Sequence, residues 1–85
     1  MTSAAVQEAV IDVLKDVSRR PIEPAPNHDL IADLGLDSLQ VMETVAQLED
    51  RFSVVIPTDN LAGIRTVADV VARVFQLVES RPAAS

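Results

Sequence analysis

The chain has 85 residues, which fits one domain, and carries a formal net charge of −6 at pH 7 with no cysteine. A disulfide framework is therefore excluded, the single histidine rules out a Cys/His cluster of metal ligands, and no apolar run approaches the ~20 residues needed to cross a bilayer. We expect one cytoplasmic all-α domain over residues 1–79, stabilised by packed aliphatic side chains, and a disordered tail over 80–85.

The negative charge is concentrated in the middle of the chain. Residues 21–64 contain eight acidic residues and one basic residue, Arg51, whereas the two ends are close to neutral. This distribution argues against nucleic acid or an anionic membrane as the partner. It favours docking on basic patches of other proteins, and a merely soluble acidic surface is the alternative interpretation.

Apolar residues at three- and four-residue spacing predict a first helix from about Ser3 to Ser18, with Ser3 as its N-cap and Pro21 as its stop signal. Residues 19–37, which contain three prolines and Gly35, are expected to form a long irregular loop, a type of segment that is often functional. Four apolar residues are expected to hold this loop against the core: Leu30, Ile31, Leu34 and Leu36.

A second helix is expected to begin at Asp37 or Ser38 and to end near Arg51, with Asp37 as its N-cap. Its predicted core stripe consists of Val41, Val45, Leu48 and Phe52. A second apolar stripe on another face consists of Leu39, Met42 and Ala46. Because acidic residues flank this second stripe, we interpret it as a docking surface, with burial in the core as the alternative.

Residues 53–57 have the composition of a strand but no second clear strand to pair with, so a buried loop with Ile56 inward is expected. A short helical turn is predicted from Thr58 to Ile64. Thr66 and Asp69 have the spacing of a capping box that begins a last helix. The core stripe of that helix consists of Val67, Val70, Val71, Val74 and Val78.

Ser38 is the residue whose position carries most information about function. Backbone N–H groups and the positive dipole end at a helix N-terminus favour an anion, so a phosphate ester on Ser38 is well placed there, with an ordinary capping role as the alternative. A serine nucleophile needs a base and an orienting acid, and the only histidine, His28, lies in the proline-rich loop. The sequence therefore favours a modified serine over a catalytic one, and a carrier over an enzyme.

The segment from Asp33 to Glu43, DLGLDSLQVME, resembles the phosphopantetheine attachment motif of acyl carrier proteins. The likeness continues through 48–52, 56–57 and 64–67 and covers about residues 28–78. It implies a four-helix bundle with a short third helix and a long loop between the first two helices. It also implies that a separate magnesium-dependent transferase attaches 4′-phosphopantetheine from coenzyme A to Ser38, and that the thiol of this arm holds acyl groups as thioesters.

The resemblance further implies that partner enzymes with basic docking patches recognise the second helix. On this chain it assigns docking to Asp37, Leu39, Gln40, Met42, Glu43, Glu49 and Asp50. Arg51 stands where many bacterial fatty-acid carriers have another acid, so this face is less acidic than theirs. A further hypothesis is that the valine-rich interior opens between helices to shelter an acyl chain.

The expected protein is thus a monomeric acyl carrier that presents intermediates to enzymes of fatty-acid, polyketide or related biosynthesis. Two alternatives remain open at this point. One is a peptidyl or aminoacyl carrier loaded by an adenylating enzyme, and the other is an unmodified helical module for protein interaction.

Overall fold

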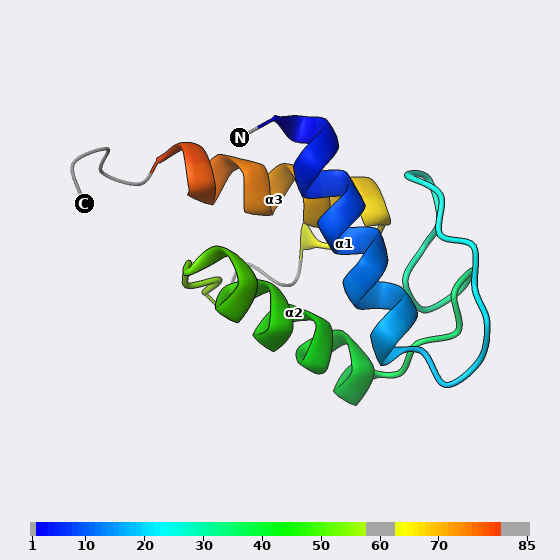
Figure 1. The fold of residues 1–85 in the computed structure, drawn as a ribbon. Helices are drawn as coiled ribbons and strands as arrows, with labels where there is room; N and C mark the ends of the chain where they lie inside the picture. Colours follow the sequence, from blue (N-terminus) through cyan, green and yellow to red (C-terminus); the bar gives the residue numbers. More distant parts are fainter. Residues whose placement is uncertain (1, 58–62, 81–85) are drawn as a thin grey trace.

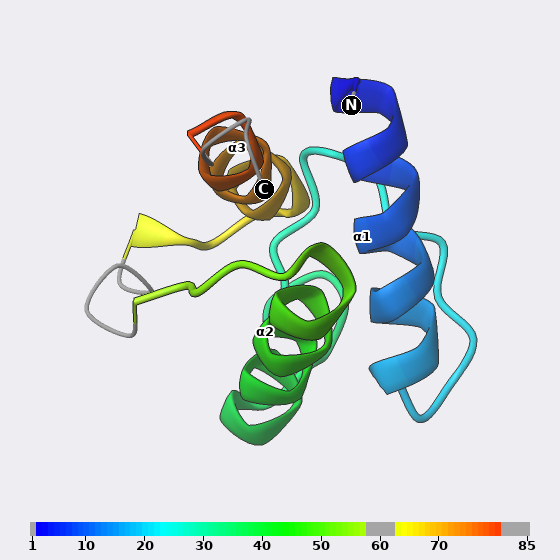
Figure 2. The ribbon, with the colours of Figure 1, turned by 60° about the vertical axis from the view of Figure 1, so that its left-hand side comes forward.

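The structure is a computed structural model that describes residues 2–57 and 63–80. This part of the chain forms three helices, α1 at Ser3–Val17, α2 at Ser38–Phe52 and α3 at Val67–Glu79 (Figure 1). α1 packs against both other helices, which approach each other less closely (Figure 2). The predicted all-α fold is confirmed. Across the described ranges there is no strand, only one isolated backbone bridge, and none of the three helices is both long and apolar enough to span a membrane.

The apolar residues whose spacing predicts α1 are buried, but the helix is capped one residue earlier than the sequence suggested. These buried residues are Val6, Val10, Val13, Leu14 and Val17. Thr2 is the N-cap, and its hydroxyl accepts a hydrogen bond from the Ala5 N–H at 3.1 Å. The prediction of Ser3 as the cap was wrong because Thr2 holds the extended backbone that a cap needs, whereas Ser3 is already helical. The helix ends at Val17, where the backbone of Ser18 becomes extended ahead of the prolines.

The long loop between α1 and α2 is tied to the segment that precedes α3. The Leu30 N–H donates to the Arg65 carbonyl at 2.9 Å, and the Val67 N–H donates to the His28 carbonyl at 3.0 Å. Three of the four predicted anchors are buried, namely Leu30, Leu34 and Leu36. Ile31 is a correction, because 58% of it is exposed.

Gly35 lies near the end of the loop before α2 and adopts a backbone conformation that is unfavourable for residues with a side chain. Its φ is 73°, in the left-handed region, and the Arg20 guanidinium lies where a Cβ would be. The positive φ explains why glycine stands at this position, three residues before Ser38, whereas the exposed Arg20 side chain could move aside for a Cβ.

The predicted capping box of α3 is present, and α2, for which the sequence predicts only the N-cap Asp37, has one as well. In α2, Asp37 accepts from the Gln40 N–H at 2.8 Å, and the Gln40 side chain accepts from the Asp37 N–H at 3.0 Å. In α3, Thr66 and Asp69 form the equivalent pair. These reciprocal bonds satisfy N–H groups that otherwise have no acceptor at a helix start, and so they define where each helix begins.

The core lies between the three helices and includes most of the predicted side chains. Val45, Leu48 and Phe52 of α2 are buried, whereas Val41 is only half-buried. Ile56 is buried in the segment after α2, as predicted. The short helical turn expected over 58–64 falls mostly on residues 58–62, which lie outside the described residues, as do residues 81–85 of the expected tail. The fourth helix therefore stays a prediction.

Candidate functional site

Ser38 is the first residue of α2, and its side chain is exposed. The Asp37 carboxylate accepts from the Gln40 N–H and so caps the helix. The N–H groups that precede Gln40 in the first turn have no intrahelical acceptor. Within the described residues, the Ser38 hydroxyl has no hydrogen-bond partner. The hydroxyl is thus free to be modified, and an anion attached to it would lie at the positive end of α2.

Ser38 lines a groove of about 240 Å³ whose other walls come from α2, the long loop and the segment before α3. Its apolar walls consist of Leu30, Ile31, Val41, Met42 and Ile64. Its charged lining residues are Asp29 and Arg65. Ser38, whose hydroxyl has no partner in the described part of the chain, therefore lines a groove that has both apolar walls and a pair of opposite charges.

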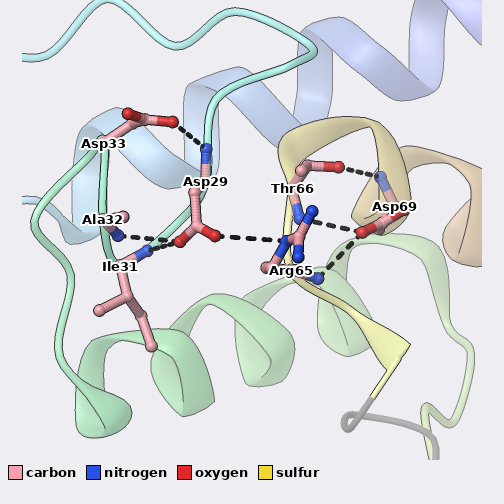
Figure 3. Close-up of polar contacts among 7 residues, drawn as sticks. All are labelled: Asp29, Ile31, Ala32, Asp33, Arg65, Thr66 and Asp69. Carbon is pink, nitrogen blue, oxygen red and sulfur yellow. Dashed lines mark hydrogen bonds and ion pairs between the residues drawn. The ribbon is translucent and has the colours of Figure 1, made fainter.

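Asp29 organises the loop wall of this groove (Figure 3). One carboxylate oxygen accepts from the Ile31 N–H at 2.9 Å and from the Ala32 N–H at 2.8 Å, while the other lies 3.5 Å from Nε of Arg65. The Asp29 N–H in turn donates to a carboxylate oxygen of Asp33 at 2.7 Å. This arrangement closes the turn that carries Ile31 and connects it to the segment before α3.

These contacts change the acidity of two carboxyl groups. Hydrogen bonds from the Ala32 and Ile31 N–H groups, with a smaller contribution from the nearby Arg65, hold the pKa of Asp29 below its ordinary value of 3.8. The pKa of Asp69 is lowered in the same way by the N–H groups of Thr66 and Arg65. Hydrogen bonds to the ionised form are the dominant cause in both cases.

We expect Asp29→Asn to reduce the acid sensitivity of folding. Because the pKa of Asp29 is lower in the folded state, its stabilising contribution is present above the unfolded value near 3.8 and is lost as the pH falls through the lower folded value. Urea unfolding of the wild type at several pH values between roughly 5 and 2 should show falling stability, with a shallower fall in the variant. Asp50→Asn, which changes an exposed carboxylate on α2, is the matched control. Equal slopes for wild type and Asp29→Asn would contradict the assignment.

The structure separates the predicted docking residues into two groups. Five of them are exposed: Asp37, Leu39, Met42, Glu43 and Asp50. Leu39 is 61% exposed, which excludes its alternative assignment to the core. We call these five residues the docking face.

Gln40 and Glu49 do not lie on this face. Gln40 is buried, and its amide donates to the Val17 carbonyl of α1 at 3.2 Å, so including it among the surface residues was an error of the sequence analysis. Glu49 is half-buried, and its carboxylate accepts from the Ile56 N–H at 2.7 Å. Both side chains hold the fold together.

Sequence reasoning missed Ile31 and Arg65 as neighbours of the serine. Neither residue belongs to the motif around Ser38, and no periodic pattern marks the loop, so the sequence carries no signal that would place them at the groove. His28 is part of the loop structure, where its Nδ1 accepts from the Ala25 N–H at 3.0 Å. No cluster of three metal-ligating side chains occurs within residues 2–57 and 63–80.

Comparison with known proteins agrees with this site. Residues 6–74 match the family model of the phosphopantetheine attachment site. The chain is 40% identical over 87 residues to the meromycolate extension acyl carrier protein of Mycolicibacterium smegmatis, covering 96% of this chain and 88% of that protein. It is 35% identical over 79 residues to an acyl carrier protein of Rhodococcus erythropolis, covering 87% of each.

The fold has a close structural relative as well. A solved structure from Mycobacterium tuberculosis, described as a candidate acyl carrier protein, superposes with a TM-score of 0.78 and 31% identity. The match covers 84% of this chain and 96% of that one. The fold and the family match therefore define a carrier that bears a prosthetic group. The chain belongs to the phosphopantetheine attachment site family, and within it to the acyl carrier proteins, which are carriers and not enzymes.

Proposed function

We propose that Ser38 is the residue to which 4′-phosphopantetheine is attached, through a phosphodiester on its hydroxyl oxygen. Three observations support the proposal: the side chain is exposed, its hydroxyl has no partner among the described residues, and it opens onto the groove. The N-terminus of α2 stabilises the phosphodiester charge through its dipole and its backbone N–H groups. When bound, the arm supplies a thiol, which the cysteine-free chain lacks and on which acyl groups are held as thioesters.

The docking face gives partner enzymes a surface to recognise. Its apolar members, Leu39 and Met42, lie among carboxylates that include Glu43 and Asp50. An exposed apolar patch surrounded by negative charge suits a partner surface with apolar pockets and basic residues. We assign to this face the phosphopantetheinyl transferase and the enzymes that load and process the acyl group. We expect the carrier to act as a monomer, in the cytoplasm where coenzyme A supplies the arm.

We propose a long fatty acyl chain under extension as the cargo. Support comes from relatives of several mycobacteria that are 36–40% identical to this chain and are named meromycolate extension acyl carrier proteins.

The apolar space between α2 and α3, lined by Val45, Leu48 and Val74, measures only about 10 Å³. That volume holds no more than roughly one water molecule. Sheltering an acyl chain there would require α2 and α3 to move apart.

Mass spectrometry tests the attachment site directly. After incubation of the protein with coenzyme A and a phosphopantetheinyl transferase, we expect one arm per chain on the tryptic peptide that ends at Arg51. Within residues 20–51, Ser38 is the only serine and Thr44 the only threonine, and Thr44 is buried with its hydroxyl donating to the Gln40 carbonyl at 2.9 Å. An arm on another peptide, or none at all, would contradict the proposal.

The loading enzyme distinguishes the carrier classes. Transfer of fatty acyl groups to the holo protein by an acyl-loading enzyme supports the proposed cargo. Loading only by an adenylating enzyme with an amino acid would instead indicate a peptidyl carrier. Full partner binding by the unmodified protein would indicate an interaction module.

A further inference from the structure

Arg65 combines a fixed backbone with a largely free side chain. Its carbonyl accepts from the Leu30 N–H at 2.9 Å, and its N–H donates to the Asp69 carboxylate at 3.0 Å (Figure 3). The side chain of Arg65 is 79% exposed, and the contact of its Nε to Asp29 at 3.5 Å is long for a charge-assisted hydrogen bond. Most of the five N–H donors of this side chain are therefore available to a ligand in the groove.

Among the described residues, Arg65 is also the only basic one that lines the groove. It comes directly after residues 21–64, a segment that contains eight acidic residues and one basic residue. The Asp29 carboxylate reaches Arg65 from the opposite wall, and its other oxygen is engaged by the Ile31 and Ala32 N–H groups. The weakly paired charges of Asp29 and Arg65 therefore line the same groove as Ser38, and the other lining residues are apolar.

The chemistry of the pantetheine arm matches these walls. Beyond its phosphate the arm has a gem-dimethyl group, a hydroxyl and two amides, so it alternates apolar and hydrogen-bonding parts. Ile31 and Met42 offer apolar surface next to Ser38. A guanidinium donates to an amide carbonyl, and a carboxylate accepts from an amide N–H, so the Arg65–Asp29 pair complements both sides of an amide.

We propose that Arg65 is a positioning residue for the arm, donating hydrogen bonds from its guanidinium to an amide carbonyl of the arm laid along the groove. The inference rests on the proposed attachment at Ser38. Arg65 takes no part in bond making. It sets the fraction of time that the arm lies against the groove and the fraction that it extends toward partner enzymes.

Three variants test the proposal. Arg65→Ala removes the donor, Arg65→Lys keeps the charge without the planar fork, and Arg19→Ala removes an exposed arginine that does not line the groove. Each is prepared with and without the arm, and the mass of every loaded sample is measured first. The readout is the difference in methyl chemical shift between the two forms at Ile31, Met42 and Ile64. A second readout is the rate at which the arm's thiol reacts with an uncharged disulfide reagent.

In the wild type and in Arg19→Ala, we expect arm-dependent shifts at the three groove methyl groups. Loss of one net hydrogen bond in Arg65→Ala should lower the ratio of docked to free arm about fivefold, shrinking these shifts and raising the thiol reaction rate. Arg65→Lys should recover part of the effect. Backbone spectra of the unloaded variants show whether the fold is unchanged outside the groove.

The outcomes separate the two proposals. A wild type that accepts no arm at Ser38 overturns the proposed function. A loaded Arg65→Ala protein with the same methyl shifts and thiol reactivity as the wild type overturns the role of Arg65 alone. Absence of any arm-dependent shift at the groove in the loaded wild type also overturns that role, and leaves the attachment at Ser38 standing.

Discussion

Ser38→Ala is expected to abolish attachment of the phosphopantetheine arm and with it all acyl loading. The hydroxyl oxygen is the atom proposed to form the phosphodiester, and no neighbouring side chain replaces it, because Asp37 caps the helix and Leu39 is apolar. Intact-mass measurement after incubation with transferase and coenzyme A should show the unmodified mass only. The fold should persist, since alanine has a high helix propensity and the hydroxyl has no partner among the described residues.

Ser3→Ala is the matched control for this experiment. Ser3 is also an exposed serine at the first position of a helix, directly after an N-cap, in this case Thr2. Unlike Ser38, Ser3 does not line the groove, and it lies on a different helix from the docking face. We expect Ser3→Ala to accept the arm at the wild-type rate. Residual attachment in Ser38→Ala would mean that another residue is the site.

The second large effect concerns stability. Leu48→Ala is expected to destabilise the fold by about 2–5 kcal/mol, because Leu48 has no exposed surface and its truncation leaves a cavity between α2 and its neighbours. Domains are stable by only roughly 5–15 kcal/mol, and one of this size lies near the lower end of that range. Urea denaturation followed by circular dichroism should show a midpoint far below that of the wild type.

Leu39→Ala is the matched control for Leu48→Ala, because it makes the same substitution at an exposed position. Leu39 lies on the same helix and is 61% exposed, so its truncation should change stability by no more than about 0.5 kcal/mol. The same variant is expected to be modified and loaded more slowly by partner enzymes, because Leu39 belongs to the docking face. A large loss of stability in Leu39→Ala, or a small one in Leu48→Ala, would contradict the burial that the fold assigns to these two leucines.

Helix positions and caps were predictable from the sequence because they depend on residues a few positions apart. The capping box of Thr66 and Asp69 and the start of α2 at Asp37 and Ser38 follow from local spacing. The attachment motif is local as well, so Ser38 could be singled out without a structure. The cap of α1 was misplaced because Thr2 and Ser3 are adjacent residues of the same capping type, and only the backbone conformation distinguishes them.

The faces of α2 show where local reasoning stops. Gln40, Thr44 and Leu48 are spaced four residues apart and share a buried face, a spacing that was visible in the sequence. Counting only apolar residues placed the stripe at Val41, and the family resemblance assigned Gln40 to the surface. Gln40 is buried because α1 ends beside it and offers the Val17 carbonyl, a contact between residues 23 positions apart.

The sequence by itself determined the class of the protein, the residue proposed for attachment and the three helices of the described residues, because a motif and a helical period are both carried by neighbouring residues. Only the tertiary structure decided which polar side chains of α2 are buried and which residues surround Ser38. Ile31 and Arg65 line the same groove because backbone hydrogen bonds bring the long loop against the segment before α3. Such long-range pairing depends on how the whole chain packs, and no local pattern encodes it.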